Sequence, residues 1–422
     1  APNGRGAAPA RFRWGPAPAG WEVASNLDGP AGAAISVDDA VQSIFTGGTD
    51  LQVIHRQVAG QPLRVAVRGE WAFEAEALGE ALARMIEAEN RYMASPAIPF
   101  FVSLIPQKGG DTGAISLGGT GRTSGFALAS TTNVDIAYLL RTLGHEYGHR
   151  WFGRALGPTA DPEAEEYWFT EGFNDFVAAQ SLVAAGLWDE RAYAESLNEV
   201  LRRYGQSPAR ARPNVETAAA FWQDSAAQQM LYDRGHLFAL LLAREGGGSR
   251  HVREALARMA REAQSFPPAE TQAERFARAF RAVPPTRLVE LREAAIVRGQ
   301  PIALPADSFG HCGTVGWIEQ PVYAPGYTAE ERSGGRFFAT VEEGSPAWAA
   351  GLRPGMRYVR RESFRPGDST VPIVMRVADG QGERVLRWLP QGRERVRFQR
   401  LELREFGGGA ERARCRAQLA GQ

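Results

Sequence analysis

The sequence predicts an α+β protein with more than one domain. Three observations support this prediction: a strand-like alternation near residues 50–70, helical patterning from Asn133 to about Ala282, and short strands with Gly/Pro turns after residue 303. The chain has 422 residues, which is too long for one ordinary hydrophobic core. We therefore expect two or three domains.

The composition is that of an ordinary globular protein and points to no special partner. Hydrophobic residues make up 44% of the chain, charged residues make up 23%, and the formal net charge is zero. A chain without surplus positive charge is not expected to bind nucleic acid. No run of apolar residues approaches the length that spans a bilayer, so we expect no transmembrane segment.

The first third of the chain predicts an irregular start, followed by strands and a helix. Residues 1–30 are rich in Pro, Ala and Gly, so we expect irregular structure there. Apolar and polar residues alternate from about 50 to 70, which predicts strands, and Phe73–Met93 has helical spacing. The apolar run Phe100–Ile105 predicts a strand, and the Gly-rich stretch 108–125 predicts loops.

A metal site is predicted in the segment RTLGHEYGHRWFG, residues 141–153. Apolar residues up to this point recur at helical spacing, which predicts a buried helix. Residues four apart share one face of a helix, so His145 and His149 project side by side. Glu146 is placed to reach a water rather than the metal, which is the H-E-x-x-H arrangement of zinc peptidases. The alternative is a helix with two satisfied histidines, but it leaves two imidazoles on an apolar helix without partners.

A catalytic zinc needs a third protein ligand, and the segment EEYWFTEGFNDF offers one. We expect Thr170 to cap a helix that begins at Glu171. Glu171 and Asp175 are four apart, so Glu171 is the predicted third ligand and Asp175 the predicted acceptor of a ligand histidine's free N–H. The alternative is an acidic first turn favoured by the helix dipole. The chemistry that follows is hydrolysis, in which zinc activates a water and Glu146 moves its proton.

Hydrolysis of an amide also needs a hydrogen-bond donor for the developing oxyanion. The helical segment LYDRGHLFALLLARE offers Tyr232 and His236, one turn apart. The alternative is a core tyrosine and a surface histidine, and the residues alone leave this choice open.

The H-E-Y-x-H helix, the WFTEGF segment and the YDRG helix, in this order, resemble the gluzincin peptidases of thermolysin-like fold. Within them the chain is most similar to the bacterial glycyl aminopeptidase family, from about residue 60 to the end. The resemblance implies a thermolysin-like zinc peptidase domain with one zinc ion held by His145, His149 and Glu171. It also implies Glu146 as the general base and Tyr232 as the transition-state donor, and it leaves His236 as a weaker candidate near the metal ligands.

The family also implies a C-terminal PDZ domain. Residues 341–359, VEEGSPAWAAGLRPGMRYV, resemble its signature: a strand, a Gly-Ser-Pro turn, a short helix and the next strand. The alternative is an ordinary small β-domain. A PDZ domain implies a peptide C-terminus as partner. We thus expect four parts: an N-terminal segment (1–55), a thermolysin-like catalytic domain (56–300), a PDZ-like domain (301–400) and a C-terminal tail (401–422).

Two features depart from the family pattern. Relatives with aminopeptidase activity carry a Gly-rich strand with a glutamate that binds the substrate's free amine, and the corresponding residues 118–131 contain no acidic residue. The choice between aminopeptidase and endopeptidase action therefore stays open. We still expect Gly118, Gly119 and Thr120 to bind an extended peptide through their backbone. In addition, residues 1–55 are too few for the family's N-terminal β-domain, so we expect a remnant of it or a trimmed chain.

Two other functions remain open: a peptide-binding protein that uses its PDZ domain, and a zinc hydrolase of non-peptide amides or esters. An intact Glu146 argues against a pure binding protein. Cys312 and Cys415 are either two free thiols or one disulfide, which requires an oxidising compartment. The chain begins at Ala1 without a methionine, which fits a processed N-terminus. We therefore expect a periplasmic or secreted protein, with the cytoplasm as the alternative.

Overall fold

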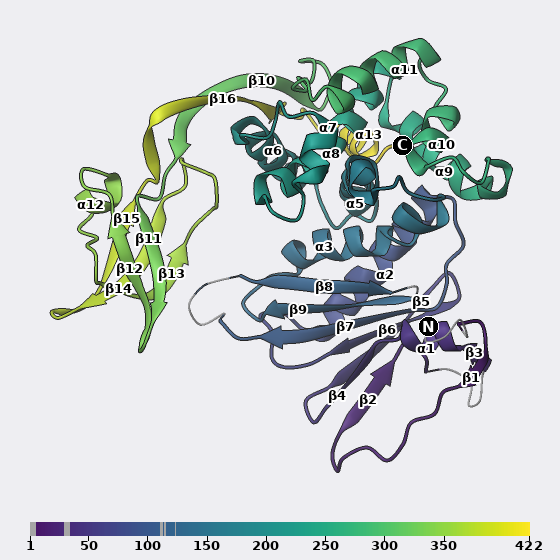
Figure 1. Cartoon of the computed structure of the whole chain (residues 1–422), viewed down its shortest axis with the longest axis horizontal. Helices are drawn as coiled ribbons and strands as arrows, with labels where there is room; N and C mark the ends of the chain where they lie inside the picture. The colour runs from purple at the N-terminus through teal and green to yellow at the C-terminus, as the bar shows by residue number, and fades with distance from the viewer. Residues whose placement is uncertain (1–5, 29–33, 110–112, 114, 123) are drawn as a thin grey trace.

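The computed structural model describes residues 6–28, 34–109, 113, 115–122 and 124–422. Figure 1 shows a mixed sheet with short N-terminal strands beside it, a group of helices above the sheet, and a small second sheet joined to the helices by a long two-stranded ribbon. The protein is therefore of mixed α+β class, as the sequence predicts.

The mixed sheet has the strand order β5-β6-β7-β9-β8. Its strands are β5 (Gln52–Val58), β6 (Gln61–Val67), β7 (Phe100–Gln107), β8 (Leu117–Arg122) and β9 (Gly125–Thr131). The three inner strands run parallel, and both outer strands are antiparallel to their neighbours. The prediction of loops is wrong for β8. Its Gly-rich residues offer no side-chain period to read, and pairing with β9 creates the strand.

Helices α2 (Ala75–Tyr92) and α3 (Ile136–Gly148) lie on the side of this sheet that faces the helical group (Figure 1). The apolar face that the sequence predicts for the helix within Phe73–Met93 is the buried face of α2, where Leu78, Leu82 and Met85 are fully buried. The opposite face of the sheet packs against the N-terminal strands. There Ala66 and Phe101 form a small core with Ala24, Ile44 and Leu51.

The N-terminal residues are more regular than the sequence predicts. They form two small antiparallel pairs, β1 with β3 and β2 with β4, together with one short helix. The elements are β1 (Pro9–Arg11), β2 (Glu22–Ser25), β3 (Ala34–Ser36), α1 (Val37–Val41) and β4 (Phe45–Gly48). The expectation of irregular structure over residues 1–30 is wrong for β1 and β2, because strand pairing over a distance overrides a Pro- and Gly-rich composition.

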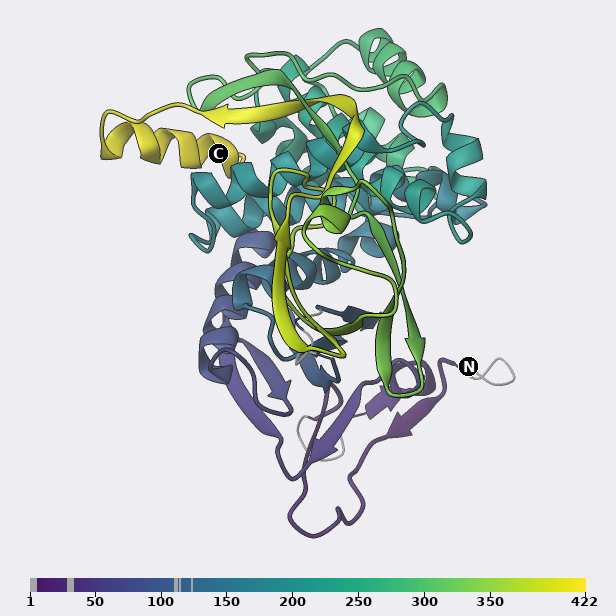
Figure 2. The same cartoon turned by 90° about the vertical axis from the view of Figure 1, so that its left-hand side faces the viewer.

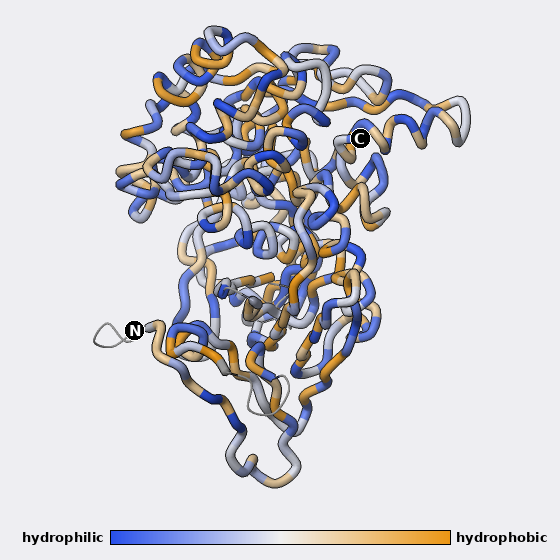
Figure 3. Tube along the Cα trace, turned by 90° about the vertical axis from the view of Figure 1, so that its right-hand side faces the viewer, coloured by the Kyte–Doolittle hydropathy of each residue, from blue (hydrophilic) through white to orange (hydrophobic). Residues whose placement is uncertain are grey.

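The helical group confirms the helical pattern predicted from Asn133 to about Ala282. It contains η3 (Trp151–Ala155), η4 (Glu163–Glu166), α4 (Tyr167–Thr170), α5 (Gly172–Ala184), α6 (Glu190–Gln206), α7 (Asn214–Ala219), α8 (Ser225–Glu245), α9 (Ser249–Arg261), η5 (Ala263–Ser265), α10 (Gln272–Ala279), α11 (Pro285–Arg292) and η6 (Glu293–Val297). Hydrophobic and hydrophilic residues are interspersed along the whole trace in Figure 3. Across the described ranges, each helix is too short or too polar to cross a bilayer.

The last third of the chain forms a long ribbon and a small sheet (Figures 1 and 2). The ribbon pairs β10 (Gly313–Tyr323) with β16 (Gln391–Leu403) in antiparallel register. The small sheet is antiparallel and consists of β11 (Tyr327–Arg332), β12 (Gly335–Val341), β13 (Arg357–Ser363), β14 (Ile373–Asp379) and β15 (Gly382–Trp388), with helix α12 (Pro346–Ala349) after β12. It has a hydrophobic core of its own.

The residues expected to form a C-terminal tail pack on the helical group instead of trailing from the small sheet. Helix α13 (Gly409–Leu419) contacts α5 and α6, and Arg416 Nε donates a 2.7 Å hydrogen bond to Glu190. Cys312 and Cys415 form a disulfide between the start of β10 and this helix. Of the two alternatives that the sequence leaves open, the structure has the disulfide.

Candidate metal centre

The two histidines of the H-E-x-x-H segment come from the end of α3, as predicted. Asp135 caps this helix through a 2.7 Å hydrogen bond from the backbone N–H of Tyr138, and buried leucines hold the helix in place. His145 lies in the last turn and His149 at the C-cap. Their ring centroids are 4.8 Å apart, so the i, i+4 spacing places both imidazoles on one side of the helix.

Glu171 brings a carboxylate to the same place. Its Oε2 atom lies 3.1 Å from His145 Nε2 and 3.5 Å from His149 Nε2. One potential ligand atom from each of the three residues lies within 4.8 Å of the others. The geometry therefore brings the three predicted ligands together.

The local structure around Glu171 differs from the prediction in one respect. Glu171 is the junction between the short helix α4 and helix α5, and the Oγ1 atom of Thr170 makes no hydrogen bond with the described residues. Thr170 therefore does not cap a helix that begins at Glu171. Since α4 already extends through Thr170, that residue has helical backbone and cannot take the extended conformation of an N-cap.

The donor set fits a zinc ion. His145 Nδ1 lies 2.9 Å from Asp175 Oδ1, and a neutral imidazole that donates Nδ1–H to this carboxylate presents its Nε2 lone pair to a metal ion beside Glu171. Two imidazole nitrogens and a carboxylate oxygen, all acceptors in this state, face one another and need a cation between them. His2Glu with an open fourth position is a ligand set of catalytic zinc.

The electrostatics of the cluster agree with this need for positive charge. Burial lowers the pKa of His145, but hydrogen bonds with Asp175 and Glu171 outweigh burial and raise that pKa well above its ordinary value. Burial raises the pKa of both carboxyl groups, and their contacts with His145 reverse this effect and hold each pKa well below its usual range. The buried carboxylates are therefore stable as anions only beside a cation.

Two residues that the sequence reasoning missed hold this cluster in position. Asn174 Nδ2 donates a 2.8 Å hydrogen bond to the backbone carbonyl of His145. Arg141 lies one turn before His145, and its Nη2 is 3.8 Å from Asp175 Oδ2. The i−4 spacing of Arg141 was a usable signal, whereas Asn174 becomes significant only when α5 packs on α3.

Glu146 lies near the edge strand β8 of the mixed sheet. The predicted backbone-binding residues Gly118, Gly119 and Thr120 are exposed on β8, and no strand pairs with the outer edge of β8 in the described part of the chain. If Gly121 carried a Cβ atom, that atom would lie 3.6 Å from Glu146 Oε2. An extended peptide that pairs with this edge would therefore run past Glu146.

Helix α8 reaches the site because two glycines allow a close crossing. A Cβ atom at Gly235 would lie 1.7 Å from the Trp168 carbonyl oxygen, and one at Gly172 would lie 2.5 Å from the Cα atom of Gly235. This contact explains why the WFTEGF and YDRG segments both need glycine. It also stacks the ring of Tyr232 beside that of His145, with centroids 5.7 Å apart and an angle of 27° between the ring planes.

Tyr232 and His236 have different surroundings. Burial and the nearby Glu171 raise the pKa of Tyr232, which keeps its hydroxyl protonated. His236 is buried against Phe176, and neither of its ring nitrogens has a hydrogen-bond partner among the described residues. Burial lowers the pKa of His236 to about 4, although Asp175 opposes this shift. His236 is therefore a neutral buried residue rather than the surface residue of the sequence alternative.

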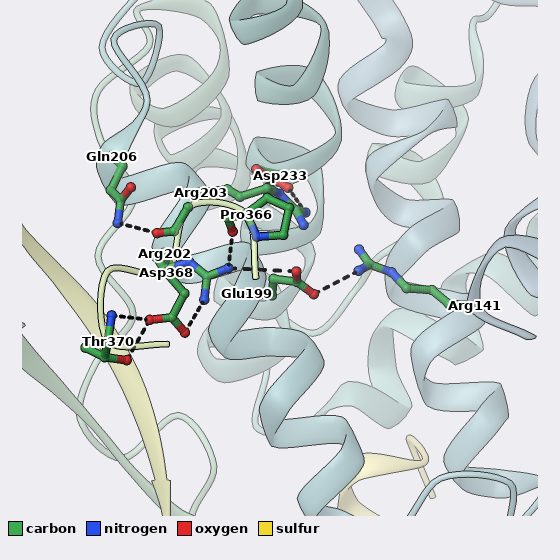
Figure 4. A network of polar contacts seen from close by, with 10 residues as sticks. Arg141, Glu199, Arg202, Arg203, Gln206, Asp233, Pro366, Asp368 and Thr370 are labelled. Carbon is green, nitrogen blue, oxygen red and sulfur yellow. Dashed lines mark hydrogen bonds and ion pairs between the residues drawn. The ribbon is translucent and has the colours of Figure 1, made fainter. Parts of the chain in front are cut away.

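A chain of charges connects the metal centre with the small sheet (Figure 4). Arg141 lies 3.8 Å from Glu199, which lies 3.8 Å from Arg202 on helix α6. Arg202 then pairs with Asp368 at 3.1 Å and donates a hydrogen bond of the same length to the carbonyl of Pro366. The loop before β14 is thus held against helix α6.

Comparison with known proteins agrees with this site. Residues 138–238 match the family model of the M61 glycyl aminopeptidases, and this segment contains His145, Glu146, His149, Glu171 and Tyr232. A comparison with curated proteins gives no match.

A solved structure with a TM-score above 0.5 shares the fold. An aminopeptidase N family protein from Idiomarina loihiensis is 15% identical, with a TM-score of 0.63, and the match covers 94% of this chain and 77% of that one. A mutant M1 zinc metallopeptidase from Deinococcus radiodurans, bound to a Tyr-Ser-Ala substrate, is 18% identical with a TM-score of 0.46, and the match covers 68% of this chain and 63% of that one. Over residues 138–238, which carry the candidate site, the family-model match confirms the resemblance to the glycyl aminopeptidase family that three sequence motifs indicate.

Proposed function

We propose that this protein is a zinc-dependent peptidase that hydrolyses peptide bonds. The observation that supports this most directly is the convergence of His145, His149 and Glu171, with Glu146 beside them at the open edge of β8. The match to a peptidase family over the same segment is independent support.

Each residue of the site has a role in this proposal. His145, His149 and Glu171 hold the zinc ion, and Asp175 keeps His145 in the tautomer that binds metal. When bound, zinc supplies a Lewis acid that acidifies water and polarises a carbonyl group. Glu146 accepts the proton of the attacking water and returns it to the leaving amine.

Tyr232 is the proposed donor to the developing oxyanion. Its ring stacks beside that of His145, on the side of the site that α8 forms. A phenol O–H can donate to an oxyanion without prior loss of its proton, which lowers the energy of the transition state more than that of the substrate.

The substrate is proposed to bind as an added strand along β8. The backbone of Gly118, Gly119 and Thr120 provides hydrogen-bond donors and acceptors at an exposed edge. In such binding the hydrogen bonds are made by the main chain of the peptide, and the residues around the strand determine which side chains are preferred.

For the rest of the chain we propose a catalytic domain over residues 56–300 and a PDZ-like domain over 301–400 that binds a peptide C-terminus. Support for the second comes from the order of β12, the Ser345-capped helix α12 and β13, with the five-stranded sheet and separate core around them. We also propose an oxidising location, periplasmic or extracellular, because the Cys312–Cys415 disulfide is stable there.

The test is to measure metal content and hydrolysis on purified wild type and on Glu146→Gln. We expect one zinc per chain in both proteins. Hydrolysis should fall by roughly 10²–10⁴ in the variant, because only the proton acceptor is lost. Full activity of Glu146→Gln would refute the assigned mechanism. Peptides with acetylated and with free N-termini, assayed side by side, distinguish endopeptidase from aminopeptidase action.

A further inference from the structure

The feature that suggests a substrate preference is the space opposite Gly121. This glycine sits on the edge strand β8, and among the described residues a Cβ atom there would meet Glu146 Oε2 at 3.6 Å and Arg154 Nη2 at 3.8 Å. Both distances are ordinary van der Waals contacts, so a Cβ atom would fit without displacing either group. The groups around this space are therefore one carboxylate and one guanidinium.

Arg154 is held in this position by its backbone. It lies in the short turn η3, five residues after His149, between the buried residues Trp151, Phe152 and Leu156. The backbone N–H of Gly153 donates a 3.1 Å hydrogen bond to Gln272, which ties the turn to α10. Arg154 is partly exposed, and its side chain projects from a fixed base.

A second arginine adds to the positive charge. Arg122 follows Gly121 on β8, and its Nη1 atom donates hydrogen bonds to Thr120 Oγ1 at 2.8 Å and to the Gly121 carbonyl at 2.9 Å. Burial and Arg122 lower the pKa of Arg154, and Glu146 opposes them. Two guanidinium groups thus act beside one carboxylate, and the balance at this end of β8 is positive.

We infer that Arg154, supported by Arg122 and given room by Gly121, forms a subsite beside Glu146 for a carboxylate of the peptide substrate. This inference rests on the proposed peptidase function and specifies its substrate class. A substrate carboxylate accepts hydrogen bonds from the guanidinium of Arg154. A free α-ammonium group placed there would be repelled by the two guanidinium groups, and Gly121 has no carboxylate that could bind it. The carboxylate comes from an acidic side chain next to the scissile bond or from the end of a short peptide.

The experiment compares matched peptides with one scissile bond. Three N-acetylated, C-amidated peptides carry Glu, Gln or Lys before the bond, a fourth has a free N-terminal amine, and a fifth has a free C-terminal carboxylate. We expect kcat/KM for the Glu peptide, or for the carboxylate-ended one, to exceed that of the Gln peptide by about tenfold, with the Lys and free-amine peptides lowest. Whichever of the two carboxylate peptides is preferred identifies the source of the charge.

Variants then assign the preference to Arg154. Arg154→Gln should abolish the preference for carboxylate, Arg154→Lys should restore part of it, and Arg191→Gln, on the exposed start of α6, should leave it unchanged. Gly121→Glu adds a carboxylate beside Arg154, and it should shift the preference by about tenfold toward the free-amine peptide. If Arg154→Gln lowers hydrolysis of all peptides equally, Arg154 only positions Glu146, and the inference is wrong.

A binding measurement separates this inference from the proposed function. Each Arg154 variant is combined with Glu146→Gln, and the affinity for fluorescent forms of the same peptides is measured by anisotropy. Preferential binding of the carboxylate peptide that depends on Arg154 supports the subsite even if no peptide is hydrolysed. Equal affinity for the Glu, Gln and Lys peptides overturns it even if the protein is an active peptidase.

Discussion

The hydrogen bond between Asp175 and His145 allows one prediction to be worked out in detail. Replacing Asp175 with Asn keeps the size of the side chain and removes its charge. In the wild type, Asp175 Oδ1 accepts the Nδ1–H of His145 at 2.9 Å, and both side chains are about nine-tenths buried. The amide of Asn can accept the same hydrogen bond, but without the negative charge that makes the imidazole a stronger metal ligand.

The expected size of the effect follows from this burial. A hydrogen bond to a charged group contributes about 1.5–3 kcal/mol, and water screens this pair little. Since about 1.4 kcal/mol is a tenfold change in an equilibrium constant, Asp175→Asn should weaken zinc affinity by roughly 10- to 100-fold.

The assay is competition with a zinc chelator of known affinity, followed by the absorbance of the chelator complex. Asp135→Asn is the matched control, because Asn caps a helix as well as Asp does and residue 135 begins the same helix α3. We expect the control to bind zinc like wild type. A zinc affinity of Asp175→Asn within about twofold of wild type would contradict the role of Asp175 in holding His145.

Three further predictions concern other parts of the molecule. Tyr232→Phe should lower kcat by about 10²–10³ with little change in KM, and a change confined to KM in steady-state assays would remove Tyr232 from the mechanism. Replacing both Cys312 and Cys415 with Ser should lower the free energy of unfolding by about 2–5 kcal/mol in urea titrations, because the disulfide spans a long loop. Wild type in reductant should show the same loss, and unchanged stability in both would contradict the reasoning. Arg202→Ala should lower the free energy of unfolding by about 3 kcal/mol, because it leaves the buried carboxylate of Asp368 unpaired. A double variant with apolar residues at positions 202 and 368 should regain most of this loss. If the double variant is no more stable than Arg202→Ala in the same titrations, the loss does not come from an unpaired charge.

The elements that the sequence predicts correctly are those whose side chains show a regular period. The helical spacing of Leu78, Leu82 and Met85 corresponds to a buried face of α2, and the alternation near residues 50–70 corresponds to β5 and β6. The errors lie where glycine or proline hides the period. The Gly-rich strand β8 and the short strands near the N-terminus depend on partners far along the chain, so local sequence does not predict them.

The sequence by itself determined which residues could form the metal centre. His145, Glu146 and His149 are close in the chain, so helix geometry alone places them. The acidic segment that contains Asp175 indicated Glu171, and resemblance to a family favoured Tyr232. This worked because the distances within one helix do not depend on what packs against it.

Only the tertiary structure decided what surrounds that chemistry. The crossing of α5 and α8 brings Tyr232 to His145, and the turn after α3 brings Arg154 opposite Gly121. It also showed that Cys312 and Cys415 lie close enough to pair. The physical reason is that these contacts join residues from separate elements, and their distances depend on how helices and strands pack rather than on spacing in the sequence.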